Sequence, residues 1–322
     1  MANIGLGLAA LGRPGYINLG HAEDLAGSYA IGAMRNNAHA VLDAAWQSGV
    51  RYFDVARSYG RAEEFLSSWI KQRKIAPDEI EVGSKWGYTY TAAWQVQTPD
   101  GIAHEIKSHQ LPVLRSHYLT TMKNLGEHLT LLQIHSATPE SGVLENAEIL
   151  EQLNRVRSSG IQIGLSVTGV SQPDTIDQAL AIEFDGARLF SSVQATWNLL
   201  EQSAGPALKR ASAAGLKVII KEGLANGRLT RRNEASEFAE KLTLVRQIAS
   251  ELNTTMDAFS LAACLNQPWA TTVLSGAATV EHLQSNLLAR DLPWNPELET
   301  RLSPLLESPD TYWATRSALP WN

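Results

Sequence analysis

The chain has 322 residues, of which 44% are hydrophobic and 19% charged. This apolar fraction is enough for a buried core and excludes an intrinsically disordered chain. The 27 Lys and Arg residues are outnumbered by 33 Asp and Glu, so the net charge of −6 offers no basic surface to nucleic acid or to an anionic membrane. A single cysteine, Cys264, excludes a disulfide framework and a cysteine metal cluster.

Short apolar runs alternate with amphipathic segments along the chain. The runs rich in Ile, Val and Leu predict strands at 4–8, 52–54, 81–85, 130–135, 162–166, 189–194, 218–221 and 272–275. The segments with apolar residues at helical spacing predict helices at 38–47, 63–72, 114–124, 148–157 and 280–288. This alternation predicts a parallel sheet, and no linker divides it. We therefore expect one α/β domain over 1–322, a closed (β/α)8 TIM barrel, with an open doubly wound sheet as the alternative.

An open doubly wound sheet would carry a dinucleotide-binding turn, and one candidate segment lies near the N-terminus. The segment Gly5-Leu6-Gly7-Leu8-Ala9-Ala10 fits the dinucleotide-binding pattern GxGxx(G/A), which requires a full strand before it and a helix opening inside it. Only four residues precede this segment, and Gly12, Pro14 and Gly15 follow where the helix would run. The sequence therefore favours a glycine-rich first barrel strand close to a ligand over a Rossmann turn.

Two long loops interrupt the alternation, at 86–110 after the third strand and at 222–233 after the seventh. Both follow strand ends, the face on which barrel enzymes build their sites. The first loop is aromatic, which makes Trp86 and Tyr88 candidate substrate contacts. Packing of these rings on the barrel rim is the alternative.

Three consecutive strands end in an ionisable residue: Asp54, Lys85 and His135. Asp54 and Lys85 could form a buried ion pair with a purely structural role, although such pairs are costly to desolvate. His135 alone could be an ordinary histidine at a strand end. Because parallel barrel strands end at the same mouth, the coincidence of an acid, an ammonium and an imidazole there predicts a catalytic site.

Tyr59 lies five residues beyond Asp54, where the turn would bring its phenol over the mouth. A free tyrosine has a pKa of about 10, and lowering it by roughly three units needs about 4 kcal/mol of differential stabilisation. A partly buried Lys85 at hydrogen-bond distance supplies energy of that order, and Asp54 would keep Lys85 charged. His135 would orient the substrate oxygen. This arrangement is a proton donor without a metal, and the segment 104–109 lacks the HExxH spacing of a zinc site.

These residues resemble the aldo-keto reductase family over nearly the whole chain. The matching segments are 53–63, 84–85, 131–135, 164–166, 192–194 and 274–277, followed by Asn286. The resemblance implies a (β/α)8 barrel that reduces an aldehyde or ketone, or oxidises an alcohol or sugar hydroxyl, with NADPH/NADP. It implies Tyr59 as the general acid/base, Lys85 and Asp54 as the groups that tune it, and His135 as the group that orients the carbonyl.

The resemblance also implies cofactor contacts. Ser166 and Gln194 would face the nicotinamide carboxamide. The loop after the seventh strand would lie over the cofactor, and the segment 275–286 would hold the adenosine-phosphate end of the cofactor. The predicted cofactor residues beyond these two are Lys221, Gly223, Leu224, Gly227, Ser275, Gly276, Ala277, His282 and Asn286.

The sequence departs from the family pattern in three places. Val167 stands where an asparagine usually follows Ser166, so one carboxamide hydrogen bond is missing or supplied otherwise. Lys221 follows Ile220 where the seventh strand usually ends in an aromatic residue; it either contacts the pyrophosphate or pairs with Glu222 at the surface. The segment 275–286 holds no Lys or Arg, and His282 is its only candidate cation. We therefore predict NADPH with a weak preference over NADH, because a neutral imidazole lacks the charge-assisted bonds that favour a phosphate.

Two other functions remain open from the sequence. Lys85 at a strand end permits a class I aldolase that forms a Schiff base, although Asp54 would keep this lysine protonated. A catalytically idle barrel that binds a nicotinamide is the other alternative.

The remaining expectations concern partners and place. In the related family the C-terminal end closes the pocket, so the aromatic tail at 310–322, which lacks helical period, is expected to lie over the barrel mouth. Packing of the tail against the flank of the barrel or against an oligomer partner is the alternative. Neither a secretory leader nor a membrane-spanning stretch is recognisable in the sequence. We expect a cytoplasmic protein, a monomer or a small homo-oligomer, that acts on a small-molecule carbonyl or alcohol.

Overall fold

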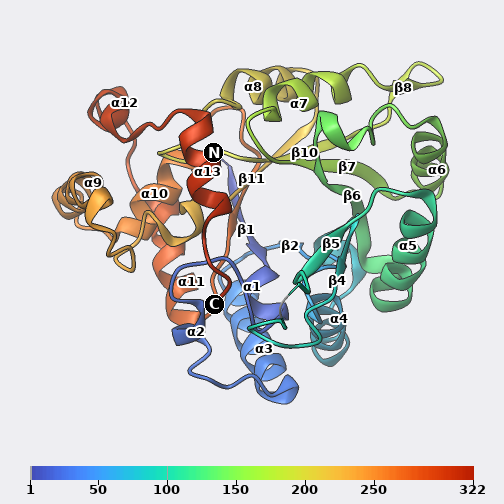
Figure 1. Ribbon diagram of the computed structural model, residues 1–322, viewed down its shortest axis with the longest axis horizontal. Coiled ribbons are helices and arrows are strands. Elements are labelled where there is room, and N and C mark those ends of the chain that lie inside the picture. The colour runs from blue at the N-terminus through green and yellow to red at the C-terminus, as the bar shows by residue number, and fades with distance from the viewer. Residues whose placement is uncertain (1, 100) are drawn as a thin grey trace.

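Short strands of buried Val, Ile and Leu form the centre of the molecule. In the computed structural model, which describes residues 2–99 and 101–322, eight parallel strands close into a barrel in the order β1-β12-β11-β10-β7-β6-β3-β2 (Figure 1). Their bounds are β1 Asn3–Gly7, β2 Tyr52–Asp54, β3 Glu81–Trp86, β6 Leu129–Ala137, β7 Gln162–Val167, β10 Ser192–Thr196, β11 Lys217–Lys221 and β12 Thr272–Ser275. The barrel closes because β1 pairs with β12 on one side and β2 on the other. The predicted TIM barrel is confirmed.

Amphipathic helices surround the barrel. They are α3 Ile31–Gln47, α4 Ala62–Arg73, α5 Leu111–Leu125, α6 Ala147–Ser158, α7 Gln172–Leu180, α8 Gly205–Ala213, α10 Met256–Leu265 and α11 Val280–Leu287. In α6, for example, Ile149, Leu153 and Val156 are buried and share one helical face, as their spacing predicts. The Asn146 side chain accepts a hydrogen bond from the Ile149 amide and so caps that helix. The outer ring thus follows from the periodicity read in the sequence.

Several further elements lie outside this repeating unit. They are α1 Ala9–Gly12, α2 His21–Asp24, the hairpin β4 Tyr88–Tyr90 with β5 Glu105–Lys107, the hairpin β8 Glu183–Phe184 with β9 Ala187–Arg188, α9 Ala239–Glu251, α12 Pro296–Leu302 and α13 Pro309–Ser317. Because α1 has four residues and β1 is a barrel strand, the glycine-rich start is not a Rossmann turn. None of the helices in the described part of the chain is long and apolar enough to cross a membrane.

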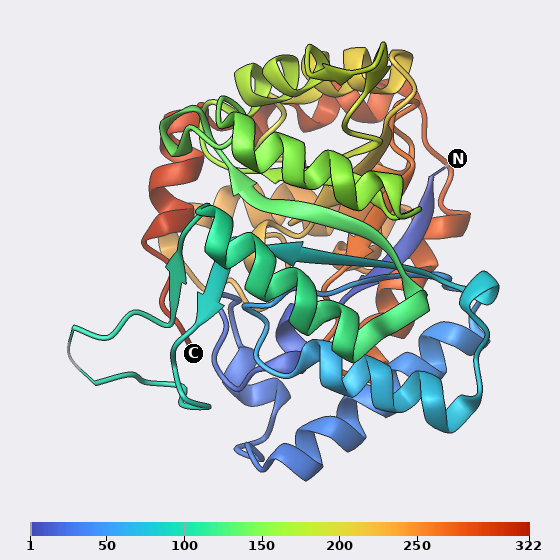
Figure 2. The ribbon, with the colours of Figure 1, turned by 90° about the vertical axis from the view of Figure 1, so that its right-hand side faces the viewer.

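The C-terminal tail differs from the prediction, because residues 309–317 form the helix α13. The Ser308 side chain caps it by accepting from the Thr311 amide. Its period is hidden in the sequence because the adjacent residues Tyr312 and Trp313 are both buried. The hairpin β4–β5 and the C-terminus lie at the end of the barrel opposite the N-terminus (Figure 2), and α13 crosses in front of the strands (Figure 1). These two segments enclose the mouth where the strands end.

Candidate active site

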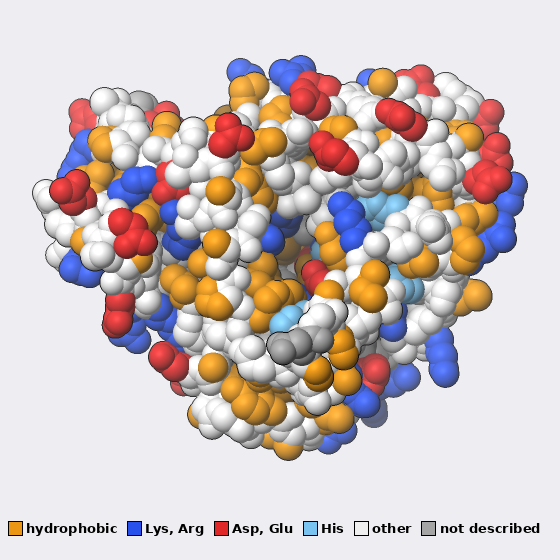
Figure 3. Space-filling view, in the orientation of Figure 1, with side chains coloured by type: hydrophobic (Ala, Val, Ile, Leu, Met, Phe, Trp, Pro, Cys, Tyr) orange, Lys and Arg blue, Asp and Glu red, His pale blue; other side chains and the backbone are white. Residues whose placement is uncertain are grey.

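A cavity of about 940 Å³ opens at the carboxyl ends of the strands, and Figure 3 shows the hollow near the centre of that face. Most of the predicted site residues line it. They are Asp54, Tyr59, Tyr88, His135, Gln194, Lys221, Gly223, Leu224, Gly227, Ser275, Gly276, Ala277, His282 and Asn286. Lys85, Trp86 and Ser166 are fully or almost fully buried and do not belong to the described lining. Gly7 of β1 also borders the cavity, as expected for a first strand close to a ligand.

Asp54, Lys85 and Tyr59 form a connected group. Asp54 is the last residue of β2, and Lys85 lies near the end of the neighbouring strand β3. The Lys85 side chain is 0% exposed, and its ammonium forms an ion pair with Asp54. The same nitrogen donates to the Val55 carbonyl oxygen at 3.2 Å and lies 3.4 Å from the Tyr59 hydroxyl. Lys85 therefore lies behind Tyr59 and Asp54, both of which line the cavity.

The second carboxylate oxygen of Asp54 is held by three donors. They are Gln194 Nε2 at 2.8 Å, Tyr52 OH at 3.3 Å and Gln133 Nε2 at 3.4 Å. A buried carboxylate needs such partners to stay satisfied. Gln194 was predicted to face the carboxamide. It lines the cavity, but its amide nitrogen donates to Asp54.

The pKa of Tyr59 is the main correction to the sequence-based chemistry. We expected Lys85 to bring this pKa down toward neutrality. In the structure, burial and then the Asp54 charge raise the pKa of Tyr59 well above its usual value, and Arg13 opposes them. The expectation failed because it counted one cation and neither the desolvation nor the acid beside it. At neutral pH Tyr59 is consequently a neutral phenol that can donate a proton.

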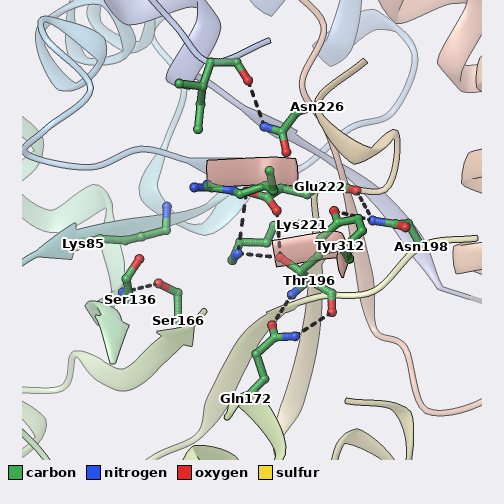
Figure 4. Close-up of polar contacts among 12 residues, drawn as sticks. Lys85, Ser136, Ser166, Gln172, Thr196, Asn198, Lys221, Glu222, Asn226 and Tyr312 are labelled. Atoms are coloured by element: carbon green, nitrogen blue, oxygen red, sulfur yellow. Dashed lines mark hydrogen bonds and ion pairs between the residues drawn. The ribbon is translucent and has the colours of Figure 1, made fainter. Parts of the chain in front are cut away.

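His135 is turned into the mouth by a β-bulge. The register of β6 against β7 is broken between Ile134 and Ala137, and Ser136 has a positive φ of 55°. Bulges of this kind re-aim side chains next to active sites. The Ser136 amide that the bulge takes out of the ladder donates to Ser166 Oγ at 2.8 Å (Figure 4). Ser166, predicted to face the carboxamide, thus supports the bulge from behind.

The His135 imidazole lies against two phenol rings, with its centroid 4.9 Å from that of Tyr88 and 5.6 Å from that of Tyr59. Burial, and then the Lys85 charge, lower the pKa of His135 well below its usual value, so the ring is neutral. Its Nδ1 is buried and has no protein partner within 2–99 and 101–322. Of the two predicted substrate contacts, Tyr88 lines the cavity and Trp86 does not. The Trp86 ring packs against His109.

Lys221 and Glu222 belong to a buried polar cluster at the end of β11 (Figure 4). Lys221 Nζ donates to Thr196 Oγ1 at 2.7 Å, and the Thr196 hydroxyl donates to Glu222 at 3.0 Å. Burial lowers the pKa of Lys221 to about 8. Burial raises the pKa of Glu222, but the charges of Arg316 and then Lys221 outweigh burial and hold this pKa at about 2. Lys221 and Glu222 are 3.9 Å apart and largely buried, so their contact is not the surface salt bridge considered from the sequence.

The other end of the cavity is formed after β12. Asn286 Nδ2 donates to Ser275 Oγ at 2.8 Å, which fixes the loop that contains Gly276 and Ala277. The Asn286 Oδ1 atom is buried and unpartnered within the described residues. His282, the predicted cation, lies 3.2 Å from Arg232 Nη2, and Arg232 forms an ion pair with Asp24.

The sequence analysis considered only the segment after β12 and so missed two further arginines that line the cavity. Arg231 and Arg246 line the same cavity, one from the loop after β11 and one from α9. The Arg-Arg pair at 231–232, in a loop on the active face, was the available signal. The inference of a weak NADPH preference rested on the absence of Lys and Arg from 275–286 alone, and it stays a prediction, since Arg231 and Arg246 line the cavity from other segments.

Two acid–base contacts near Tyr59 were also missed. Glu63, 2% exposed, accepts hydrogen bonds from Arg57, Ser84, Thr121 and Asn124, and so fixes the loop that carries Tyr59. Glu105 of β5 forms an ion pair with Arg13 at 2.8 Å. The partners in Arg57–Glu63 and in Arg13–Glu105 do not lie on one helix or strand, so the sequence pattern does not reveal either ion pair.

Comparison with known proteins gives concordant matches. The model of the aldo/keto reductase family matches residues 3–303. The uncharacterized oxidoreductase YqkF of Bacillus subtilis (strain 168) is 24% identical over 310 residues, 90% of this chain and 94% of that protein. The D-threo-aldose 1-dehydrogenase of a Pseudomonas species is 24% identical over 84% of this chain and 89% of its own length. The holo structure of the aldo-keto reductase AKR11C1 from Bacillus halodurans superposes with a TM-score of 0.68 at 17% identity, covering 95% of this chain and 92% of that one.

Proposed function

The chain belongs to the aldo/keto reductase family and is an oxidoreductase that uses a nicotinamide cofactor, and from this premise we propose that it reduces an aldehyde or ketone to an alcohol with NADPH, with Tyr59 as the proton donor. The observation that carries the proposal is the contact of the Tyr59 hydroxyl with Lys85, which is itself paired with Asp54. The raised pKa keeps Tyr59 protonated at neutral pH, which is the state that a proton donor requires.

The cavity fits a dinucleotide. Its volume of about 940 Å³ lies within the usual size range of cofactor pockets, about 300–1,000 Å³. It extends from the Tyr59 group to the N-terminal end of α11, where the Thr279 side chain caps the helix. Asn286, in the last turn of α11, also lines the cavity, and its Oδ1 atom has no hydrogen-bond partner among the residues that the structure describes. Helix N-termini favour phosphate groups because their free amides and dipole attract anions. Arg231 and Arg246, which line the same cavity, would supply the charge that a 2′-phosphate requires.

A bound nicotinamide supplies the hydride for the carbonyl carbon. The chain's own residues act on the carbonyl oxygen. The neutral His135 imidazole donates a hydrogen bond that orients this oxygen, and Tyr59 transfers its proton to it. Lys85 then stabilises the phenolate that remains, and Asp54 keeps the ammonium in place through the pair that both groups form.

The burial of Lys85 argues against the aldolase alternative. A Schiff-base lysine must present a free amine to the substrate. The Lys85 side chain is 0% exposed, is paired with Asp54 and lies outside the described cavity lining. The idle-barrel alternative is left to experiment.

The test is a screen of the full chain with NADPH and a panel that contains 4-nitrobenzaldehyde, acetophenone and D-xylose. Turnover is measured as the loss of the reduced-nicotinamide absorbance. We expect turnover that falls by about 10²–10⁴-fold in Tyr59→Phe, the usual contribution of a general acid. Tyr118→Phe, a half-buried tyrosine on α5, is the matched control and should keep full activity. Unchanged turnover in Tyr59→Phe contradicts the proposal, and cofactor binding without turnover across the panel indicates the idle barrel. Borohydride trapping of substrate on Lys85 indicates the aldolase.

A further inference from the structure

Arg13 lies beside Tyr59 inside the barrel mouth, although it comes from a different loop. Its side chain is 3% exposed, and its Nη1 donates to the Ser58 carbonyl oxygen at 3.0 Å and to Glu105 Oε2 at 2.8 Å. Its guanidinium carbon lies 5.3 Å from the centre of the Tyr59 ring. Both Arg13 and Glu105 line the cavity. The buried charge therefore touches the residue before Tyr59 and faces the phenol itself.

The position of Arg13 is fixed by close backbone packing of two loops. The Arg61 amide donates to the Gly12 carbonyl oxygen at 2.7 Å. A Cβ on Gly12 would lie 2.3 Å from the Tyr59 carbonyl oxygen, and one on Gly60, whose φ is +56°, would lie 2.4 Å from the Gly12 carbonyl oxygen. Glycine is required at both positions for this approach. The loop of Arg13 and the loop of Tyr59 are consequently packed backbone against backbone.

We propose that Arg13 is a positioning residue for Tyr59, which holds the Tyr59 loop and stabilises the phenolate, and that Glu105 weakens this stabilisation. The inference rests on the proposed role of Tyr59 as proton donor. It adds a second cation to the one that Lys85 supplies and assigns a role to the hairpin β4–β5, because Glu105 belongs to β5.

The charges around the phenol favour a net effect of Arg13. The titratable and charged groups that face Tyr59 from the surrounding elements are Arg13, Tyr16, Tyr52, Asp54, Lys85, Glu105, His135 and Glu222. Arg13 lowers the pKa of Tyr59, whereas Glu105 and Glu222 raise it. The Glu105 side chain is 23% exposed against 3% for Arg13, so water screens the anion better than the cation. The cation thus outweighs its partner at the phenol.

The inference predicts that replacing Arg13 and replacing Glu105 shift the pKa of residue 59 in opposite directions. Arg13→Met and Glu105→Gln each break the same contact, so a purely structural role predicts the same effect from both. Loss of the cation should raise the pKa of residue 59 by about one unit, the size expected for a charge about 5 Å away. Loss of the anion should lower this pKa by a smaller amount. Arg13→Lys should keep the wild-type value, because it retains the charge.

The readout is ¹⁹F NMR titration of 2,3,5-trifluorotyrosine placed at position 59 of the full chain, since this phenol titrates at lower pH than tyrosine. The alkaline limb of carbonyl reduction by the same proteins is the second readout and should move with the titration. Arg210→Met, which breaks an exposed ion pair with Asp177, is the control and should shift neither. Shifts in the same direction, or none, in Arg13→Met and Glu105→Gln overturn the inference. Full turnover of Tyr59→Phe instead overturns the proposed function, so the two failures are distinguishable.

Discussion

Arg316, on the C-terminal helix α13, donates hydrogen bonds from Nε and Nη2 to the same carboxylate oxygen of Glu222, at 3.2 and 2.7 Å. Glu222 directly follows β11, so this contact attaches the C-terminal helix to the barrel mouth. A second contact, from Asn198 Nδ2 to the Tyr312 hydroxyl at 2.9 Å, attaches the same helix to the loop after β10 (Figure 4). The helix that encloses the cavity is thus held by polar side chains on two strand ends.

Arg316→Met should destabilise the protein more than an ordinary surface change. It leaves the Glu222 carboxylate, 9% exposed, without its main cation. Since Arg316 is itself 26% exposed, we expect a loss of about 2–3 kcal/mol in the free energy of unfolding, below the range for a fully buried pair. Thermal melting and urea unfolding measure this loss.

The control for this change is Arg210→Met, whose exposed pair with Asp177 should be worth less than about 1 kcal/mol. In the double variant Arg316→Met/Glu222→Gln, part of the lost stability should return, because the uncompensated charge is gone. Equal losses for the two arginine variants would show that α13 is held by its apolar contacts alone.

Acid should weaken the contribution of Glu222 in a defined window. The folded-state pKa of Glu222 is about 2, below the usual 4.5, so the ionised carboxylate stabilises the fold above about pH 4.5. This stability is lost as the pH falls from about 4.5 toward 2, where the folded carboxylate takes up its proton. The difference in melting temperature between the wild type and Glu222→Gln should therefore be largest at neutral pH and shrink across that window. A constant difference from pH 7 to pH 3 contradicts the low pKa.

The strand ends were the part of the site that sequence could predict. The runs at 52–54 and 272–275 match β2 and β12 residue for residue. Because β2, β3 and β6 are neighbours in the barrel, the pattern also predicted that Asp54, Lys85 and His135 share one mouth. Each of these inferences uses local periodicity plus the rule that parallel strands end on the same side.

The remainder of the site depends on contacts between distant segments. Arg13 and Glu105 are separated by 92 positions, and Arg316 and Glu222 by 94. A loop, a hairpin strand, a strand end and a C-terminal helix place these side chains, and no period in the sequence shows how they pair. The direction of the Tyr59 pKa was missed for a related reason, since burial is a property of the whole packed mouth.

Ser166→Ala distinguishes two roles for this serine. If Ser166 supports the bulge that aims His135, its loss frees the Ser136 amide and should lower kcat roughly tenfold, about 1.4 kcal/mol and thus the worth of one hydrogen bond, with the cofactor KM unchanged. If Ser166 instead binds the carboxamide, as the sequence suggested, the cofactor KM should rise. Steady-state kinetics at varied NADPH separate the outcomes. Ser191→Ala, which removes a donor to the Ile163 carbonyl oxygen, is the control and should change neither constant.

Lys221 should make cofactor affinity depend on pH. With a pKa of about 8, the ammonium is charged at pH 7 and neutral at pH 9.5. Glu222, with a pKa of about 2, keeps its charge over this range. An anionic cofactor should therefore bind roughly tenfold more weakly at pH 9.5, the loss expected for one charge-assisted hydrogen bond.

Fluorescence titration with NADPH at the two pH values measures this change. Lys221→Met should bind weakly at both, and Lys221→Arg should bind tightly at both. The exposed Lys217→Met, which removes a surface pair with Glu81, should behave as the wild type. A tenfold pH effect that persists in Lys221→Met would assign the titration to another group.

Arg231 and Arg246 should determine the choice between NADPH and NADH. Both line the cavity from segments outside 275–286, and they carry permanent positive charge, whereas His282 lies against Arg232 and near Asp24. A 2′-phosphate held by an arginine gains a charge-assisted bond of about 1.5–3 kcal/mol that NADH cannot form. Replacing either arginine with alanine should thus lower kcat/KM for NADPH roughly tenfold and leave that for NADH nearly unchanged. Arg155→Ala, an exposed arginine on α6, should alter neither value. If His282→Ala lowers the NADPH preference while the two arginine variants retain it, the phosphate lies at the segment after β12, as the sequence alone suggested.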